Sequence, residues 1–159
     1  MRIQTSLSIL TVFLLLAFAL PAHAFNCNVN VTGLGFGGYD VFSNIPKDAT
    51  ATVTVTRNAT PQNPNAPIPV IISLSPGNSG NFAQRHMQRV GGPERLAYNL
   101  YTTPSFSTAW GDGSAGSQTQ TNLVTRTNPW NATIYARIPA GQNVPVGSYS
   151  DVITVTIEW

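Results

Sequence analysis

The segment YSDVITVTIEW at residues 149–159 gives the clearest indication of the fold class, because its residues alternate between two faces. One face carries Tyr149, Asp151, Ile153, Val155, Ile157 and Trp159. The other face carries Ser150, Val152, Thr154, Thr156 and Glu158. Successive side chains of a β-strand point to opposite faces, and β-branched and aromatic residues suit a half-buried pleated surface. The stretch therefore predicts a strand with one face turned toward a core.

The same alternation extends outward from this stretch along the chain. It occurs at residues 26–31, 50–56, 96–101 and 130–138, while the denser apolar run Ile68 to Leu74 suits a central strand. Clusters of Gly and Pro separate these segments: Gly33–Gly38, Pro61–Pro67, Pro76–Gly80, Gly91–Pro93, Gly111–Gly116 and Pro139–Gly147. No segment keeps a helical period over three turns. Short strands with regular turn signals predict an all-β, antiparallel sandwich or barrel.

The N-terminal segment has the pattern of a secretory signal peptide. Arg2 gives a positive start, Leu7 to Leu20 is almost wholly apolar, and Ala22-His23-Ala24 offers the small residues of a cleavage site. We expect residues 1–24 to be removed between Ala24 and Phe25, which leaves one domain over residues 25–159. The apolar run is short for a membrane span, and no later run reaches that length. We therefore expect an exported protein without a membrane span after signal cleavage.

Composition narrows the possible partners. Charged residues are 9% of the chain and the net charge is +2, so no strongly basic surface indicates a nucleic-acid partner. Cys27 is the only cysteine, which excludes an internal disulfide. In an oxidising compartment this unpaired cysteine is either a partner for an intermolecular bond or a small buried residue.

The residues that could perform chemistry are few and scattered. After signal cleavage His86 is the only histidine, and the six carboxylates show no paired spacing, so we expect no catalytic residue, no metal site and no cofactor. Residues 33–38 formally match G-x-G-x-x-G, but no helical pattern follows to hold a pyrophosphate. These glycines are better explained by a bulge or sharp turn between strands.

Several ordered motifs resemble the spore coat protein U domain family over nearly the whole mature chain. They are Cys27, Phe36–Asp40, the Thr-Val strand at 50–56, Leu74–Gly80, Arg85–Met87, Leu96–Thr102, Trp110–Gly113, Tyr135–Gln142 and Gly147–Asp151 leading to Thr154–Thr156. The resemblance implies a secreted domain of spore coats and of archaic chaperone–usher pilins.

Such pilins resemble an immunoglobulin-like sandwich that lacks its final strand. A periplasmic chaperone, delivering to an usher, and then a neighbouring pilin or coat subunit would supply the missing strand. The resemblance thus implies export through the periplasm to a fimbrium or the cell surface. The strand-acceptor groove would be lined by the first and last strands: Val29, Val31, Ile153, Val155, Ile157 and Trp159.

Two departures from the family pattern bear on the expected role. The family's second cysteine would stand at Arg57, so the disulfide to Cys27 is absent. Phe25 starts almost directly on the first strand, which leaves no segment to donate onward, so we expect a terminal or accessory subunit. The alternative function is an adhesin that contacts a surface or glycan, with exposed loops near Pro61–Pro67 and Trp110–Ser117.

Overall fold

The computed structural model describes residues 26–58 and 65–159. The predicted signal peptide, its cleavage junction at Ala24 and Phe25, and most of the Pro61–Pro67 loop lie outside the described residues. The described chain forms β1 (Cys27–Val31), β2 (Lys47–Arg57), β3 (Ile68–Leu74), the 3-10 turn η1 (Gly77–Ser79), β4 (Arg85–Arg89), β5 (Arg95–Tyr101), β6 (Gln120–Val124), β7 (Trp130–Ile138), β8 (Tyr149–Ser150) and β9 (Val155–Glu158).

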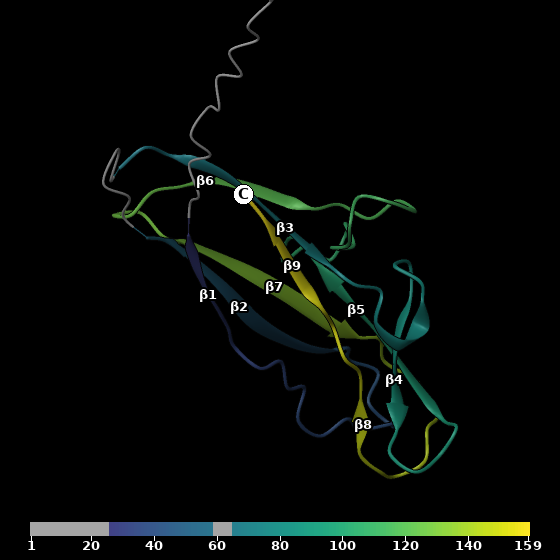
Figure 1. The fold of residues 1–159 in the computed structure, drawn as a ribbon. Coiled ribbons are helices and arrows are strands. Elements are labelled where there is room, and N and C mark those ends of the chain that lie inside the picture. The colour runs from purple at the N-terminus through teal and green to yellow at the C-terminus, as the bar shows by residue number, and fades with distance from the viewer. Residues whose placement is uncertain (1–25, 59–64) are drawn as a thin grey trace, which may run out of the picture.

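These strands form two sheets that face each other (Figure 1). One sheet has six strands in the order β1-β2-β7-β5-β4-β8, and the other has three in the order β6-β3-β9. All pairs of these strands run antiparallel. The prediction of an all-β, antiparallel sandwich is confirmed.

The core lies between the sheets and follows the alternation of the sequence. Every second residue is buried from Ala51 onward in β2, throughout β3 and from Ala132 onward in β7, as the period of two predicts. Trp110 is fully buried, and its indole Nε1 donates a hydrogen bond to the carbonyl of Ile72 at 3.0 Å. The Trp110–Ser117 loop therefore points its aromatic residue into the core and does not offer it to a ligand.

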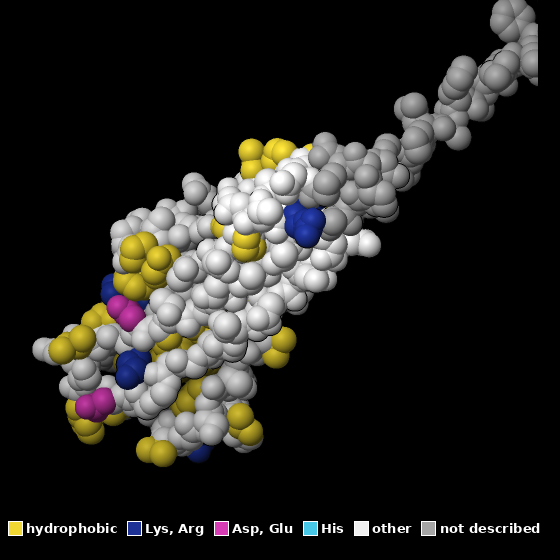
Figure 2. Space-filling model, turned by 90° about the vertical axis from the view of Figure 1, so that its left-hand side faces the viewer, with side chains coloured by type: hydrophobic (Ala, Val, Ile, Leu, Met, Phe, Trp, Pro, Cys, Tyr) yellow, Lys and Arg dark blue, Asp and Glu magenta, His cyan; other side chains and the backbone are white. Residues whose placement is uncertain are grey.

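The surface carries few charges, as the composition indicates. Figure 2 shows one face, where backbone and uncharged polar side chains cover the middle and hydrophobic side chains gather mainly toward the lower left. Hydrogen bonding on this surface therefore depends on Ser, Thr, Asn and Gln.

The terminal strand is not continuous, contrary to the prediction for residues 149–159. β8 pairs with β4 in the six-stranded sheet, whereas β9 pairs with β3 in the other sheet. Between them the Asp151 carboxylate accepts the backbone N–H of Asn78 at 2.8 Å, and Thr154 N–H binds the Ser75 hydroxyl at 2.9 Å. Side chains thus supply part of the bonding where the chain crosses from one sheet to the other, beside the backbone hydrogen bond from Ser75 N–H to the Thr154 carbonyl at 2.9 Å.

Candidate interaction groove

β1 and β9 are both edge strands, and they lie at neighbouring edges of the two sheets (Figure 1). Within the described residues β1 pairs only with β2, and β9 pairs only with β3. An edge strand leaves a row of backbone N–H and C=O groups available for another strand. Each sheet therefore presents an open edge on this side of the sandwich.

The two edge strands keep apolar, core-facing side chains accessible. Val29 and Val31 stand opposite Val55 and Val53, and directly opposed residues share one face of a sheet. Val53 and Val55 are 0% exposed, yet Val29 is 42% and Val31 44% exposed. The core side of β1 is therefore not covered.

β9, at the edge of the smaller sheet, likewise carries partly exposed side chains opposite buried ones. Val155 stands opposite Leu74 and Ile157 opposite Ile72, both of which are buried. Val155 and Ile157 themselves are only half-buried. Apolar side chains that face the core thus stay partly exposed on both edges.

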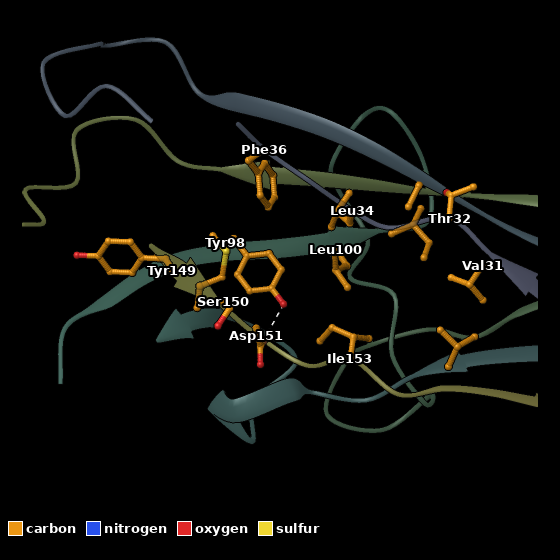
Figure 3. A pocket seen from close by; sticks show the side chains of 14 residues that line it. Val31, Thr32, Leu34, Phe36, Tyr98, Leu100, Tyr149, Ser150, Asp151 and Ile153 are labelled. Atoms are coloured by element: carbon orange, nitrogen blue, oxygen red, sulfur yellow. Dashed lines mark hydrogen bonds between the residues drawn. The ribbon is translucent and has the colours of Figure 1, made fainter. Parts of the chain in front are cut away.

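A groove joins these edges along the segment that follows β1. It encloses a cavity of about 310 Å³, with Val31 on one side and Ile153 and Val155 on the other. Its floor includes Ala51, a core residue of β2. Figure 3 shows Leu34 and Phe36 on one side of this space and Ile153 on the other.

The opposite edge of the smaller sheet differs in chemistry. On β6, Asn122 stands opposite Val70 and Gln120 opposite Ile72, so these two residues occupy core-facing positions. They are polar, which suits contact with water. Apolar residues at the equivalent positions of β1 and β9 therefore distinguish the groove edge from an ordinary sandwich edge.

The six residues predicted for the groove are distributed unevenly. Val31, Ile153 and Val155 line the cavity, while Ile157 packs against the core beyond it. Val29 is on the core-facing side of β1, outside the cavity lining, and Trp159 is 53% exposed at the end of β9.

The glycine-rich segment and the sheet floor supply a part of the lining that the sequence does not predict. Leu34, Phe36, Met87 and Tyr98 all line the cavity. Leu34 and Phe36 alternate with glycines, a signal that was attributed to a turn. Period-two spacing of large apolar residues inside that segment was the usable clue.

A polar cluster closes one end of the groove. The Tyr98 hydroxyl donates to Asp151 Oδ2 at 2.8 Å (Figure 3). Asp151 Oδ1 accepts the N–H groups of Asn78 and Val152. Burial, reinforced by the hydrogen bond to Asp151, raises the pKa of Tyr98, so the phenol stays protonated. Asp151 thereby fixes the segment that carries Ile153 into the groove.

Cys27 lies beside the groove on β1 and stands opposite Arg57 of β2. The thiol is half-buried, and this burial raises the pKa of Cys27, against a smaller opposing effect of the Arg57 charge. Arg57 is 1% exposed, and its guanidinium Nη1 donates to the carbonyl of Ala66. An arginine therefore occupies the place that the family resemblance gives to a second cysteine.

The remaining candidate groups form no further centre. His86 lies on β4, and in residues 26–58 and 65–159 no group of three His, Cys, Asp or Glu side chains is arranged to hold a metal ion. No helix in the same residues is long and apolar enough to cross a membrane.

Comparison with known proteins finds a curated relative and a similar solved fold. Protein U of Myxococcus xanthus is 31% identical over 81 residues, which make up 51% of this chain and 44% of that protein. The chain thus matches less than half the length of this relative. One chain of the CsuC–CsuE chaperone–tip adhesion subunit pre-assembly complex, from the archaic chaperone-usher Csu pili of Acinetobacter baumannii, aligns with a TM-score of 0.57. It is 18% identical, and the alignment covers 86% of this chain and 40% of that chain.

The family assignment comes from a match across most of the sequence. The model of the Spore Coat Protein U domain matches residues 13–156, which include every strand of the larger sheet and the start of β9. The chain therefore belongs to the Spore Coat Protein U domain family.

Proposed function

We propose that this chain is an exported structural subunit of a surface fimbria or coat-like layer, and that it is assembled by accepting a β-strand into the groove between β1 and β9. The observation that carries the proposal is the exposure of Val29 and Val31, whose register partners Val55 and Val53 are completely buried. A strand laid along the groove would cover these side chains and pair with the open edges.

The physical gain from such a strand has two parts. Backbone groups of the two edges would gain partners, and apolar side chains would leave water. Completing the burial of one half-exposed valine contributes about 1 kcal/mol. Several such side chains together favour a strand with apolar residues at alternate positions.

The family and the fold support the proposed partners. The similar solved chain comes from a complex of a chaperone with a tip subunit, which supports a periplasmic chaperone as the first donor of the strand. An usher and then a neighbouring pilin or coat subunit would follow. In this proposal residues 1–24 direct export, and cleavage before Phe25 leaves two residues ahead of β1. The subunit would then receive a strand without donating one, as a terminal or accessory subunit does.

The test is to produce residues 25–159 in a bacterial periplasm with and without a chaperone of the archaic chaperone–usher class. We expect the chaperone to raise the soluble yield and to co-purify with the domain. Val155→Asp places a charge in the groove and should abolish the complex. Val152→Asp is the matched control, because Val152 is 76% exposed and does not line the groove.

A soluble, monomeric domain that unfolds cooperatively and ignores the chaperone would contradict the proposal. Equal binding by the two aspartate variants would also contradict it, because the groove would then not be the contact.

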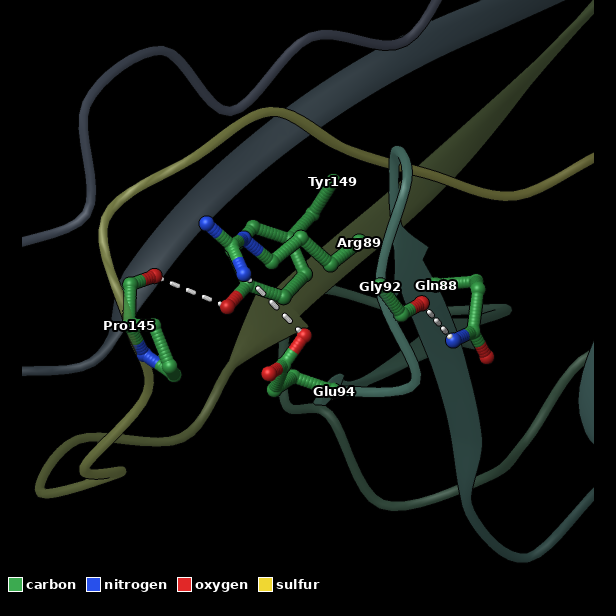
Figure 4. A network of polar contacts seen from close by, with 6 residues as sticks. All are labelled: Gln88, Arg89, Gly92, Glu94, Pro145 and Tyr149. Atoms are coloured by element: carbon green, nitrogen blue, oxygen red, sulfur yellow. Dashed lines mark hydrogen bonds and ion pairs between the residues drawn. The ribbon is translucent and has the colours of Figure 1, made fainter.

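A second candidate function is adhesion, supported by an apolar end of the sandwich. Phe42 is 94% and Val146 95% exposed, and both line a cavity of about 650 Å³ between the loops that follow β1 and β7. One hydrogen bond from the Tyr149 hydroxyl to the Pro145 carbonyl, and an Arg89–Glu94 ion pair in the neighbouring hairpin, hold this end together (Figure 4). Exposed apolar side chains on constrained loops suit contact with an apolar surface.

Retention on octyl-agarose tests this candidate. Phe42→Ser and Val146→Ser should each reduce retention more than Leu123→Ser, which removes an exposed apolar side chain from β6. Equal reductions would show a general loss of hydrophobicity and remove the support for adhesion at this end.

A further inference from the structure

Residues 33–38, here named the strap, run directly from β1 along the groove. The strap places Leu34 and Phe36 in the cavity lining, facing Ile153 from the other wall (Figure 3). Phe36 meets Tyr98 edge to face, with ring centroids 5.9 Å apart. The chain's own segment thus occupies part of the space between the two groove walls.

Hydrogen bonds hold the strap only through the residues next to its two ends. Just before it, Thr32 N–H binds the Thr52 carbonyl at 3.0 Å, and just after it the Tyr39 hydroxyl binds the Pro139 carbonyl at 2.9 Å. Within the described part of the chain, no backbone group of residues 33–38 forms a hydrogen bond. Moving the strap would therefore break no backbone pairing.

Packing around the strap is incomplete on both sides. Leu34 and Phe36 line the groove cavity of about 310 Å³ and also the cavity of about 650 Å³ behind it. Both side chains are only half-buried. Their contacts therefore hold the strap weakly compared with a core position.

The glycines of the strap are not required by the conformation that the structure shows. A Cβ at Gly33, Gly35 or Gly38 would meet no atom within 4 Å, and none of the three has a positive φ. Gly37 alone needs its conformational freedom, with φ +69. Glycine without a local steric reason retains the freedom to adopt a second backbone conformation.

From these observations we propose that the strap is a displaceable placeholder: Leu34 and Phe36 fill one end of the groove in the free subunit and leave it when a partner strand enters. This inference rests on the proposed strand-accepting function. The incoming strand replaces two half-buried side chains and adds the backbone pairing that the strap lacks. The strap thereby shields part of the groove before assembly without competing strongly against the partner.

The experiment places one reporter thiol on each wall of the groove. In a Cys27→Ser background, Leu34→Cys reports on the strap and Ile153→Cys on the opposite wall. Both positions are half-buried, so each variant is first matched to the background by its free energy of unfolding. The rate of reaction with a maleimide dye is then measured alone and with a periplasmic chaperone of the archaic chaperone–usher class, which is the probe.

The two thiols should respond in opposite directions. Insertion of the probe strand should protect residue 153 several-fold, while displacement of the strap should accelerate the reaction at residue 34 several-fold. Protection at both positions would overturn the strap proposal and leave strand acceptance intact. Absence of protection at residue 153 would overturn strand acceptance, and the strap proposal with it.

Truncating the Phe36 side chain of the strap gives an independent readout. Phe36→Ala should weaken the free domain and yet strengthen probe binding, because the strap then competes less for the groove. A side chain with a purely structural role would weaken both. Reduced or unchanged probe affinity in Phe36→Ala would therefore contradict displacement.

Discussion

Both ends of the Gln142 side-chain amide bind the backbone of Ala97. Oε1 accepts the Ala97 N–H at 2.8 Å, and Nε2 donates to the Ala97 carbonyl at 2.9 Å. The β5–β7 register ends with Asn99 opposite Arg137, and continuing it by two residues would place Ala97 opposite Pro139. Proline has no N–H to donate, so the glutamine amide takes over the pairing that the strand cannot supply.

Gln142→Ala should destabilise the domain, because the Ala97 backbone loses both partners. A lost hydrogen bond that leaves a partly buried group unsatisfied costs about 1–3 kcal/mol. The measurement is the free energy of unfolding in urea. Gln88→Ala is the matched control, because Gln88 Nε2 donates only to the Gly92 carbonyl in the adjacent hairpin turn (Figure 4). A cost no larger than that of the control would show that the Gln142 pairing adds nothing to the sheet.

Arg85 should be among the most sensitive positions of the fold. It is 0% exposed, and its guanidinium donates to the carbonyls of Ser75 and Trp110 and to Asn99 Oδ1. Burial is the main cause that lowers the pKa of Arg85, while Tyr98 and Asp151 oppose it. Because the lost donors leave buried carbonyls unsatisfied, Arg85→Met should cost roughly 3 kcal/mol or more.

Arg85→Lys is the informative companion variant. Lysine keeps the positive charge but lacks the planar fork that reaches several acceptors at once. We expect the urea midpoint of Arg85→Lys to fall nearly as far as that of Arg85→Met. Full retention of stability by lysine would mean that charge alone, and not the shape of the guanidinium, holds these segments.

The strands with clear alternation could be predicted from the sequence, whereas two strands could not. β4 begins with the buried Arg85, and its remaining residues are half-buried, so no apolar alternation marks it. In β6 the core-facing positions include Gln120 and Asn122, which resemble a loop in composition. β6 pairs with β3, and β4 pairs with β8 as well as with the adjacent β5, so each strand has a partner that is distant in sequence and that a local pattern does not contain.

The groove was predictable only in part for a related reason. Val31, Ile153 and Val155 carry the alternation of the edge strands, and they line the cavity. The break between β8 and β9 depends on the Asp151 carboxylate reaching Asn78, a contact across 73 residues. Leu34 and Phe36 alternate with glycines in a segment without strand pairing, so their spacing indicates one shared face, and tertiary packing decides that this face lies in the groove.

Acid should remove a small part of the stability through Asp48. Arg137 donates to both carboxylate oxygens at 2.7 Å, and this hydrogen bonding is the main cause that lowers the pKa of Asp48. Because the pKa of Asp48 is lower in the folded protein than in the unfolded chain, the ionised carboxylate stabilises the fold at pH values above the unfolded pKa of about 3.9. This stabilisation is lost as the pH falls through the folded pKa. Since both side chains are partly exposed, the pair contributes less than about 1 kcal/mol.

The measurement compares the wild type with Asp48→Asn at neutral pH and at a pH below the folded pKa. The wild type should be more stable at neutral pH, and the gap should close in acid and narrow in high salt. A gap that persists in acid would contradict an electrostatic origin, since the carboxylate is then protonated. Arg137 also stacks on Phe106, with its Cζ 3.6 Å from the ring centroid, and this contact remains in Asp48→Asn.

Arg57→Cys should restore a cross-strand disulfide to Cys27. The residue pair just beyond Cys27 and Arg57, Asn26 and Asn58, is hydrogen-bonded, because the Asn58 N–H donates to the Asn26 carbonyl at 2.8 Å. Because antiparallel pairs alternate, Cys27 and Arg57 form a non-hydrogen-bonded pair, whose Cα atoms lie about 4.5 Å apart. That separation is within the range of disulfides, about 4.4–6.8 Å.

After oxidation, thiol titration of Arg57→Cys should find no free cysteine, and reducing the bond should lower the free energy of unfolding by about 2–4 kcal/mol. Comparing oxidised and reduced forms of one variant separates the disulfide from the loss of the Arg57 hydrogen bond to Ala66, and Arg57→Ser measures that loss alone. Two titratable thiols after oxidation would mean that β1 does not hold this register on β2, and the accessible core face of β1 would lose its structural basis.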